Sequence, residues 1–402
     1  MEPTRKELIL AAAVFLALPL LMEAGLRIAG TQFEPQLYEP NRDRGWTLRP
    51  NASGVVTAEN KQEVRINSLG FRDRERRYDK PEGTVRIAVL GNSWTEALQV
   101  PLEKTYPAVL EGELRRKGCF GGKQLEVLNF GVAGYSTSQE LLALQQEVWK
   151  YKPDVVLLAF YPARDIANNV RELNNAANPE QSPYYAYRDG KLIEDTAFRG
   201  MPALQSRQIS FQEMRHGVND HVKLLQAVNA LQRSAKLRLA TAEVKERAEK
   251  FGVENLEYSI YAPPATDSMR EAWRVTEGLL SMMRDEVSAH GAAFRVVVLA
   301  TRPQVLPDGE QRAELQRKLG VRDFSYADQR LLEFGARENV PVTLLSRPLS
   351  AYAEAHHVYL NGFNERNWGS GHWNETGHRL AAEAIAADLC GGLVPGGKAG
   401  GE

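Results

Sequence analysis

A serine early in the chain and a histidine near its end have the chemistry of a nucleophile and its base. Ser93 lies on a tight turn directly after the apolar run 85–90, and His372 lies in the glycine-rich phrase 369–374. A serine hydroxyl attacks acyl groups when an adjacent imidazole takes its proton. The pair therefore predicts acyl transfer through serine, provided that folding brings the two side chains together.

Five short apolar or β-branched runs are predicted as strands, each followed by a polar or glycine-containing segment: Val85–Leu90, Leu125–Phe130, Val155–Tyr161, Phe294–Ala300 and Val342–Leu345. Helical patterns such as 105–117 and 138–151 lie between them. Strands that alternate with helices favour a parallel sheet covered on both faces. We predict an α/β fold with a doubly wound, flavodoxin-like sheet of about five strands in three α/β/α layers. Ligands bind at the carboxyl ends of such strands, where Ser93 lies.

The chain is predicted to have four parts: a membrane anchor (1–30), a lead-in segment (31–80), a catalytic domain (81–392) and a flexible glycine-rich tail (393–402). The lead-in is rich in Pro, Asn, Arg and Gly, so we expect an irregular segment that lies against the domain. An insertion at about 168–290 turns helical near 211–250 and is either a lid or substrate wall, or a purely structural cap.

The N-terminal apolar run begins at Leu8 and, extended to about 20 residues, is long enough to cross a bilayer as a helix. Arg5 and Lys6 precede it, which favours an N-terminus on the cytoplasmic side. We expect an uncleaved single-pass anchor with the catalytic domain outside the cytoplasm, in the periplasm or at the cell surface. The alternatives are a cleaved signal peptide, which would make the protein secreted, and a buried helix of a soluble protein.

Two cysteines fit an oxidising compartment. Cys119 ends the first helix of the domain and Cys390 ends the last, and these two helices can be neighbours on one face of a doubly wound sheet. A disulfide is one reading of the pair, and two buried free thiols are the other.

Four segments of the sequence resemble the SGNH, or GDSL-type, hydrolase family, over roughly residues 40–390: Gly91-Asn-Ser93, Asn129-Phe-Gly-Val-Ala-Gly-Tyr-Ser136, Phe160-Tyr-Pro-Ala-Arg-Asp-Ile-Ala-Asn-Asn169 and Gly369-Ser-Gly-His-Trp-Asn374. The lead-in phrase Arg65-Ile-Asn-Ser-Leu-Gly-Phe-Arg72 looks like membrane-anchored members. The resemblance implies that Ser93 is the nucleophile and His372 the base. It also implies that the backbone N–H groups of Ser93 and Gly134 hold the oxyanion, with Asn92 bridging the nucleophile turn where the family usually has Asp.

Two positions depart from the family pattern. The third block has Ala163 and Arg164 where the family carries its oxyanion-binding Asn, followed by the expected Asp165. Arg164 is therefore a candidate oxyanion donor or a partner for an anionic ligand, or it pairs with Asp165. The acid that usually precedes the histidine is absent, since Gly369 and Ser370 occupy those positions. Asp165, Glu365 and Glu375 are candidates to orient the imidazole, and a backbone carbonyl is the alternative.

Composition excludes several functions. The formal net charge is -1 and no basic stripe with interleaved aromatics occurs, so we expect no nucleic-acid partner. The histidines and cysteines lack metal-ligand spacing, and no phosphate-cradling loop is present, so we expect neither metal nor other cofactor.

The sequence predicts a serine esterase that removes acyl groups, most plausibly O-acetyl, from an extracytoplasmic glycan or an acylated small molecule. One alternative transfers the acyl group to a sugar hydroxyl in polysaccharide modification. Another is a membrane-tethered binding or assembly protein that kept the fold and lost turnover, because two usual catalytic positions are replaced. The sequence leaves the oligomeric state open.

Overall fold

A computed structural model describes residues 4–175, 179–250 and 257–392 of the chain. The predicted flexible tail lies outside the described residues. The central feature is a five-stranded sheet with strands in the order β11-β10-β7-β5-β6, all parallel. It consists of β5 (Thr84–Gly91), β6 (Gln124–Gly131), β7 (Val155–Phe160), β10 (Ala293–Val298) and β11 (Val342–Leu344). This order is that of a flavodoxin-like doubly wound fold, which confirms the predicted class.

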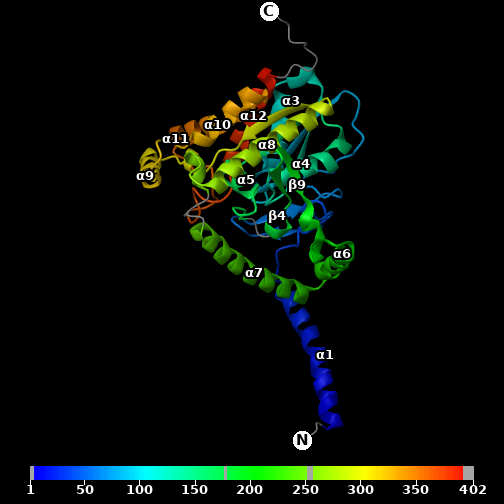
Figure 1. The fold of residues 1–402 in the computed structure, drawn as a ribbon. Coiled ribbons are helices and arrows are strands. Elements are labelled where there is room, and N and C mark those ends of the chain that lie inside the picture. Colours follow the sequence, from blue (N-terminus) through cyan, green and yellow to red (C-terminus); the bar gives the residue numbers. More distant parts are fainter. Residues whose placement is uncertain (1–3, 176–178, 251–256, 393–402) are drawn as a thin grey trace, which may run out of the picture.

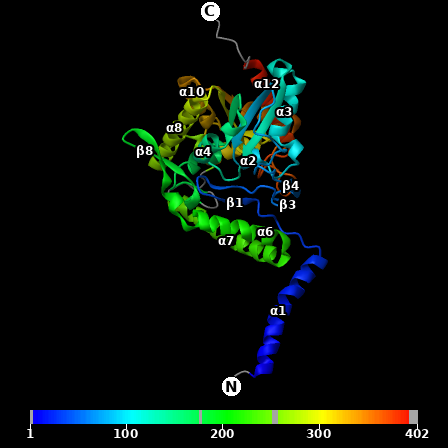
Figure 2. The same cartoon turned by 90° about the vertical axis from the view of Figure 1, so that its right-hand side faces the viewer.

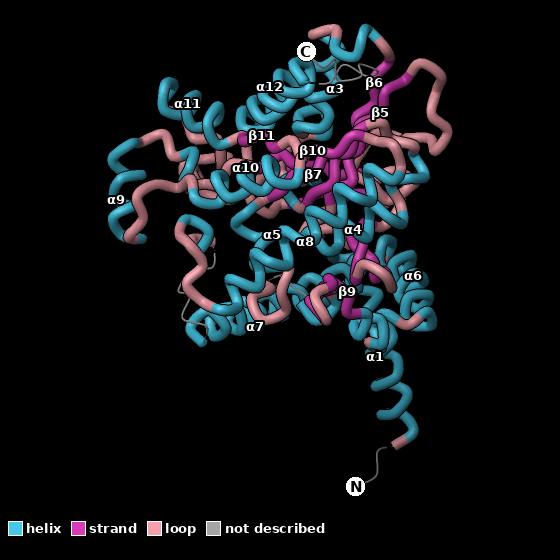
Figure 3. The backbone as a smooth tube through the Cα atoms, turned by 45° about the horizontal axis from the view of Figure 1, so that its top comes forward, coloured by secondary structure: helices cyan, strands magenta, loops and turns pink. Residues whose placement is uncertain are grey.

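The sheet forms because its inner strands β5 and β7 are buried and largely apolar. All eight residues of β5 and all six of β7 are buried, which is typical of a parallel strand covered on both faces. Figure 3 shows these strands as one twisted layer at the centre of the molecule. The main helices are α1 (Arg5–Ile28), α2 (Ser93–Glu96), α3 (Tyr106–Arg116), α4 (Thr137–Gln146), α5 (Pro162–Asn168), α6 (Ser206–His221), α7 (Lys223–Lys250), α8 (Asp267–Ala289), α9 (Gly309–Leu319), α10 (Tyr326–Glu338), α11 (Ser346–His356) and α12 (Glu375–Gly392).

Helices cover the sheet in two further layers. Helices α3 and α12 pack together, and α4 and α5 pack against α8 (Figure 1). Helix α8 buries a stripe from Met269 to Val287 and contacts β10, the strand that follows it. It is therefore the crossover helix between β7 and β10. The predicted insertion, about 168–290, included this helix.

The lead-in is more regular than expected. It forms two antiparallel hairpins, β1 (Tyr38–Asn41) with β2 (Gly45–Leu48), and β3 (Ser53–Val56) with β4 (Gln62–Arg65). The expectation of an irregular segment was wrong here, because paired hairpins satisfy backbone groups that isolated loops would leave to water. The lead-in does lie against the domain, as predicted, with Val64, Ile66 and Leu48 in the main core.

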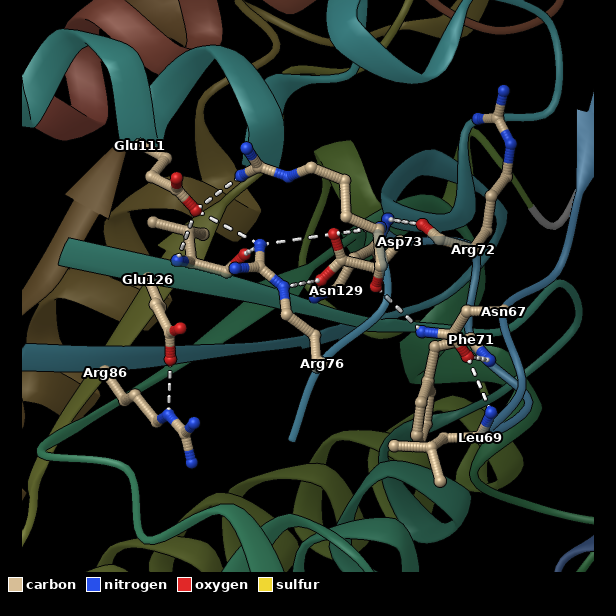
Figure 4. A network of polar contacts seen from close by, with 12 residues as sticks. Asn67, Leu69, Phe71, Arg72, Asp73, Arg76, Arg86, Glu111, Glu126 and Asn129 are labelled. Carbon is tan, nitrogen blue, oxygen red and sulfur yellow. Dashed lines mark hydrogen bonds and ion pairs between the residues drawn. The ribbon is translucent and has the colours of Figure 1, made fainter. Parts of the chain in front are cut away.

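A polar network joins the end of the lead-in to the sheet (Figure 4). Asp73 accepts a hydrogen bond from the backbone N–H of Asn129 in β6, at 3.3 Å, and pairs with Arg76 at 2.9 Å. Arg76 also reaches Glu111 of α3, at 3.1 Å. These side chains are largely buried, and partnered charges of this kind are costly to separate. The lead-in is thereby fixed to the edge of the sheet.

The insertion after α5 begins with a hairpin, β8 (Tyr184–Arg188) and β9 (Lys191–Asp195), and continues into α6 and α7. Helices α6 and α7 lie beneath the lead-in hairpins at the end of the molecule from which α1 extends (Figures 1 and 2). Helicity near 211–250 is as predicted.

Helix α1 is long and apolar enough to cross a membrane, with a mean hydropathy of 2.2 in its most apolar window. That window has no buried residues, and a signal sequence would meet the same criteria of length and composition. Its Glu23 and Arg27 form an ion pair at 2.6 Å, one helical turn apart.

A disulfide joins Cys119 to Cys390, with Cα atoms 5.3 Å apart. It ties the end of α12 to the turn that follows α3, as the adjacency of the first and last helices allowed. The alternative of two free thiols does not apply.

Candidate active site

The nucleophile turn is held by the residue before the serine. β5 ends at Gly91, and Ser93 is the first residue of α2. The Asn92 side chain accepts from the backbone N–H of Trp94 at 3.1 Å and donates to Asp165 Oδ1 at 2.8 Å. Asn92 thus caps the short helix and ties it to α5, the bridging role expected of it.

Two glycines let α2 approach the sheet closely. A Cβ at Gly91 would lie 2.1 Å from Thr95 Oγ1, and one at Gly131 would lie 2.4 Å from the backbone nitrogen of Glu96. Neither distance is compatible with a side chain, so glycine is required at the ends of both β5 and β6. This close approach fixes the position of the Ser93 hydroxyl at the carboxyl edge of the sheet.

The structure brings Ser93 and His372 together. His372 Nε2 lies 2.8 Å from Ser93 Oγ, although the two residues are 279 positions apart. The imidazole also packs against the Trp94 ring, with centroids 4.9 Å apart. Its loop is fixed from below, because Trp373 is fully buried and Asn374 donates to the carbonyl oxygen of Tyr359 at 2.9 Å.

Glu59, in the turn between β3 and β4, holds the other side of the imidazole. Its Oε1 lies 2.8 Å from His372 Nδ1, and its Oε2 accepts from the His372 backbone N–H at 2.7 Å. Glu59 has a left-handed backbone with φ of 65°, a conformation that a non-glycine residue adopts at a cost and that is frequent at functional sites. Asn367 Nδ2 supports the turn by donating to the Glu59 carbonyl oxygen at 3.1 Å.

The Glu59 carboxylate is favoured in its charged form. Burial opposes ionisation, but hydrogen bonds and charge from His372, together with the charge of Arg302, outweigh it and hold the pKa of Glu59 below its ordinary value. A charged carboxylate at Nδ1 keeps the proton on that nitrogen, which leaves Nε2 free to accept one from serine.

None of the carboxylates proposed from the sequence occupies this position. Asp165 is buried and accepts from Asn92 and from the backbone N–H of Tyr161 at 2.6 Å. Burial raises the pKa of Asp165, against the effect of those two hydrogen bonds. Glu375 is exposed and lies 3.9 Å from Lys104, and Glu365 is exposed on the surface. The acid at His372 is therefore Glu59, which sequence reasoning missed.

Local sequence offered no signal for Glu59, since it lies 313 positions from His372 in a segment without a catalytic motif. One indirect signal was the glycine before the histidine. A Cβ at Gly371 would lie 2.2 Å from Glu59 Oε2, and Gly371 has φ of 70°. This glycine leaves the space that the remote carboxylate fills.

Gln99 also approaches the imidazole, with Nε2 3.2 Å from His372 Nδ1. Both atoms are donors when the Nδ1 proton is directed at Glu59, so the amide oxygen suits this position better than the nitrogen. As placed, Gln99 Oε1 is buried and has no hydrogen-bond partner among the described residues. With its amide turned over, Gln99 would accept a hydrogen bond from His372 Nδ1–H through Oε1, beside the bond that Glu59 accepts.

Trp46 of β2 holds the loop of the expected oxyanion glycine. Its indole N–H donates to the Ala133 carbonyl oxygen at 2.9 Å. A Cβ at Gly134 would lie 3.2 Å from the indole ring, and Gly134 has φ of 81°, so both space and backbone favour glycine. On the other side of the loop, Glu96 accepts from the Ala133 backbone N–H.

Arg164 lies on the wall of the site and its guanidinium is engaged by neighbours. It donates to Asn175 Oδ1 at 2.8 Å and pairs with Glu257 at 3.1 Å. Arg302 pairs with the same carboxylate from the opposite side. Pairing of Arg164 with Asp165 was one of three alternatives that the sequence left open, and the carboxylate that pairs with it is instead Glu257.

A cavity of about 340 Å³ opens at the nucleophile. Its walls come from the nucleophile turn, the glycine loop, α5, the insertion and the lead-in: Glu59, Asn92, Ser93, Trp94, Ala133, Gly134, Tyr135, Tyr161, Arg164, Asn168, Asn175, Glu257, Arg302, Gly371 and His372. A small acyl group and part of its alcohol fit in such a volume. Within residues 4–175, 179–250 and 257–392, no cluster of three or more His, Cys, Asp or Glu side chains suited to a metal ion is found.

The similarities found between this chain and known proteins are low. No family model matches it. An arylesterase of Vibrio mimicus is 26% identical over 100 residues, which cover 23% of this chain and 48% of that protein, so the chain spans about half the length of this relative.

Similar solved structures include an α/β hydrolase from the metagenome of Lake Arreo, Spain, at 13% identity and a TM-score of 0.36, covering 78% of this chain and 97% of that one. A protein of the G-D-S-L family from Desulfitobacterium hafniense has 12% identity and a TM-score of 0.30, and the match covers 75% of this chain and 98% of that one. The similarities are low, so any activity has to be argued from the side chains of the site.

Proposed function

We propose that this protein is a serine esterase of the SGNH type that hydrolyses acyl esters through an acyl-Ser93 intermediate. The observation that carries the proposal is the continuous chain from Glu59 through His372 to Ser93, with both links at 2.8 Å. Hydrogen-bonded nucleophile, base and orienting acid are recognised by their geometry and roles, whatever their order in the sequence.

In the first half of the reaction, His372 Nε2 takes the proton of Ser93 Oγ as the oxygen attacks the ester carbonyl. The backbone N–H groups of Ser93 and Gly134 are the proposed donors to the resulting oxyanion. Each such donor is worth about 2.7–4 kcal/mol of transition-state stabilisation in comparable enzymes. Glu59 stabilises the imidazolium, which then gives its proton to the leaving alcohol oxygen as the C–O bond breaks.

In the second half, His372 removes a proton from water as the water oxygen attacks the acyl carbon of acyl-Ser93. The bond to Oγ breaks, the acid is released, and the proton returns to Ser93. We assign Arg164 to the substrate wall, because Glu257 and Asn175 already hold its guanidinium. A guanidinium held in this way orients a substrate more readily than it moves onto a developing oxyanion.

The proposed substrate is an O-acetyl ester on a glycan outside the cytoplasm. The small cavity favours a short acyl group. The disulfide between Cys119 and Cys390 is typical of an oxidising compartment, and α1 is suited to a single-pass anchor with the N-terminus inside. Transfer of the acyl group to a sugar hydroxyl instead of water would need the same steps with a different acceptor.

The experiment is hydrolysis of a short-chain aryl ester by the purified full-length protein in detergent, compared with Ser93→Ala. We expect kcat of the variant to fall by a factor on the order of 10⁶, which leaves only the residual catalysis that substrate binding and the oxyanion donors supply. Ser325→Ala, at the cap of α10, is the matched control and should retain full activity. Equal turnover by the wild type and Ser93→Ala would show that Ser93 is not the nucleophile. No turnover by either protein on aryl esters and acetylated glycans would favour the lapsed binding protein.

A further inference from the structure

Helices α6 and α7 carry an apolar stripe that faces away from the rest of the protein. On α6 the exposed apolar side chains are Phe211, Met214 and Val218, and on α7 they are Leu225, Val228, Leu231 and Leu239, with exposed fractions from 38% to 72%. Within each helix these side chains are three, four or eight residues apart, so they lie on one face of that helix. An apolar stripe on a helix surface marks a contact with something that the isolated chain does not contain.

The opposite faces of the two helices are attached to the lead-in and to each other. Arg49 makes a two-pronged ion pair with Asp220 at 2.7 and 3.0 Å, and His216 is buried. Asn229 of α7 donates to Asn219 of α6 at 2.5 Å. The orientation of the apolar stripe is therefore set by polar contacts on the inner side.

The junction of α6 and α7 is fixed to the end of α1. Glu23 accepts from the backbone N–H groups of Lys223 and Leu224, at 3.1 and 2.8 Å, and so caps the start of α7. Arg27 donates to the His221 carbonyl oxygen. The helix suited to cross a bilayer thus ends where α7 begins, and α6 and α7 extend sideways from that point beneath the domain (Figures 1 and 2).

Helix α7 is also basic, since its sequence carries seven Lys or Arg residues and three Glu. A basic helix with an apolar stripe is suited to the interface of an anionic bilayer, with the apolar side chains at the acyl boundary and the cations among the headgroups. We propose that α6 and α7 form a membrane-surface platform that rests on anionic lipid beside α1. This inference relies on the proposed membrane anchor and is independent of the proposed esterase activity.

The platform would hold the active site at a fixed distance from the bilayer. The lead-in that carries Glu59 lies between α6 and α7 and the carboxyl edge of the sheet (Figure 2). Arg233 of α7 reaches Glu34 of the lead-in at 3.4 Å. Substrates would then be esters displayed close to the membrane surface.

The test uses the full-length protein with one added cysteine, labelled without reductant by an environment-sensitive fluorophore. Met214→Cys and Leu231→Cys probe the stripe, Ser288→Cys on α8 probes the body, and Leu16→Cys probes α1. Each is reconstituted in phosphatidylcholine vesicles with or without phosphatidylglycerol, and quenching by doxyl-labelled lipid is recorded. The unfolding temperature of each variant reports on folding.

We expect positions 214 and 231 to show blue-shifted emission and quenching by lipid that increases with phosphatidylglycerol, while position 288 shows neither. Quenching at position 16 with none at 214 and 231 would overturn the platform and leave the anchor standing. No quenching at position 16 would overturn both. Protection of 214 and 231 that persists in detergent and rises with protein concentration would assign the stripe to a second copy of the chain and contradict the lipid proposal.

Discussion

The lead-in turn at Glu59 and the loop of His372 meet at one imidazole from opposite ends of the chain. The histidine loop is held by short-range contacts, such as Asn361 Nδ2 to the Gly371 carbonyl oxygen at 3.0 Å. The Glu59 turn depends on contacts between distant segments, including Asn367 at 3.1 Å and Asn60 Nδ2 to the Gln99 carbonyl oxygen at 2.9 Å. The comparison shows that the loop of the base is held by neighbouring residues, whereas the acid is positioned by the assembly of the lead-in on the domain.

The same contrast applies on the oxyanion side of the cavity. The loop with Gly134 comes from the end of β6, but its Ala133 carbonyl oxygen is held by Trp46 of the lead-in. The lead-in therefore supports both halves of the proposed machinery, the orienting acid and the oxyanion loop. Substitutions in the lead-in should therefore lower turnover, although the lead-in precedes Ser93 in the sequence and contains no recognised catalytic motif.

Among substitutions other than those of Ser93, the largest effect should come from Glu59→Gln. Loss of the carboxylate leaves Nδ1 without its charged acceptor, and kcat should fall by a factor on the order of 10⁴, as in other serine hydrolases that lose the acid. Steady-state hydrolysis of an aryl ester measures it. Glu375→Gln, which changes an exposed carboxylate next to the histidine loop, is the control and should leave kcat unchanged. A normal rate for Glu59→Gln would return the orienting role to another group.

Trp46→Phe should have the next largest effect. The ring is kept but the indole N–H that holds the Ala133 carbonyl oxygen is lost, so kcat should fall by roughly tenfold, less than the ~10²–10³-fold cost of losing an oxyanion donor. KM should change little, because the ground state does not carry the developing charge. Trp149→Phe removes an indole N–H that donates to Glu286 on another part of the domain, at 2.9 Å, and serves as control. An equal loss in both variants would show a general effect on folding.

Arg164→Ala tests whether Arg164, on the cavity wall, binds the substrate in the ground state or stabilises the transition state. We expect KM to rise by roughly fivefold, equivalent to about 1 kcal/mol, with kcat nearly constant. Arg171→Ala, which breaks an exposed pair with Asp195 at 3.1 Å, is the control. If kcat falls and KM does not, Arg164 serves the oxyanion in place of the missing Asn.

A smaller effect is expected in the pH dependence of stability. Glu96 accepts hydrogen bonds from Tyr38 of the lead-in, at 2.7 Å, and from the oxyanion loop, and burial raises its pKa to about 7. Between about pH 4.5 and pH 7, the folded protein therefore keeps the proton on Glu96, whereas the unfolded chain has released it. The stabilising contribution is therefore complete below about pH 4.5 and is lost as pH rises through about 7, at no more than ~1.4 kcal/mol per pH unit.

Urea unfolding at pH 5, 6 and 7 measures this slope. Burial also raises the pKa of Asp165 and of Glu140, which act in the same direction, so the comparison with Glu96→Gln isolates one group. The variant should lose stability less steeply with rising pH than the wild type. Parallel slopes would mean that Glu96 is already ionised at pH 5 in the folded protein.

The sequence predicted the sheet well because each strand is a local apolar run. The expected strand 85–90 is β5 (Thr84–Gly91), and the parallel pairing of the strands follows from their alternation with helices. The meeting of Ser93 and His372 was also predictable, since both follow recognisable phrases at the carboxyl edge of the sheet. Glu59 was not, because its position depends on a hairpin register, a left-handed turn and the space left by Gly371, none of which is a local pattern.

The roles of Arg164 and α8 were hidden for a related reason. Glu257, which engages Arg164, comes from the far end of the insertion, and a side chain's partner across such a distance has no signature in one sequence. Helix α8 looked like part of the insertion because the chain between β7 and β10 is long. Its buried stripe against β10 reveals that it is a layer helix of the fold.

The central claim is that Glu59 activates Ser93 through His372. Its most direct measurement is the rate at which a fluorophosphonate modifies the protein, followed by mass spectrometry of the modified peptide, for the wild type, Glu59→Gln and Glu375→Gln. We predict a single adduct on Ser93, a rate for Glu59→Gln lower by about 10³-fold or more, and an unchanged rate for Glu375→Gln. Equal rates in all three proteins, or an adduct on a residue other than Ser93, would contradict the account.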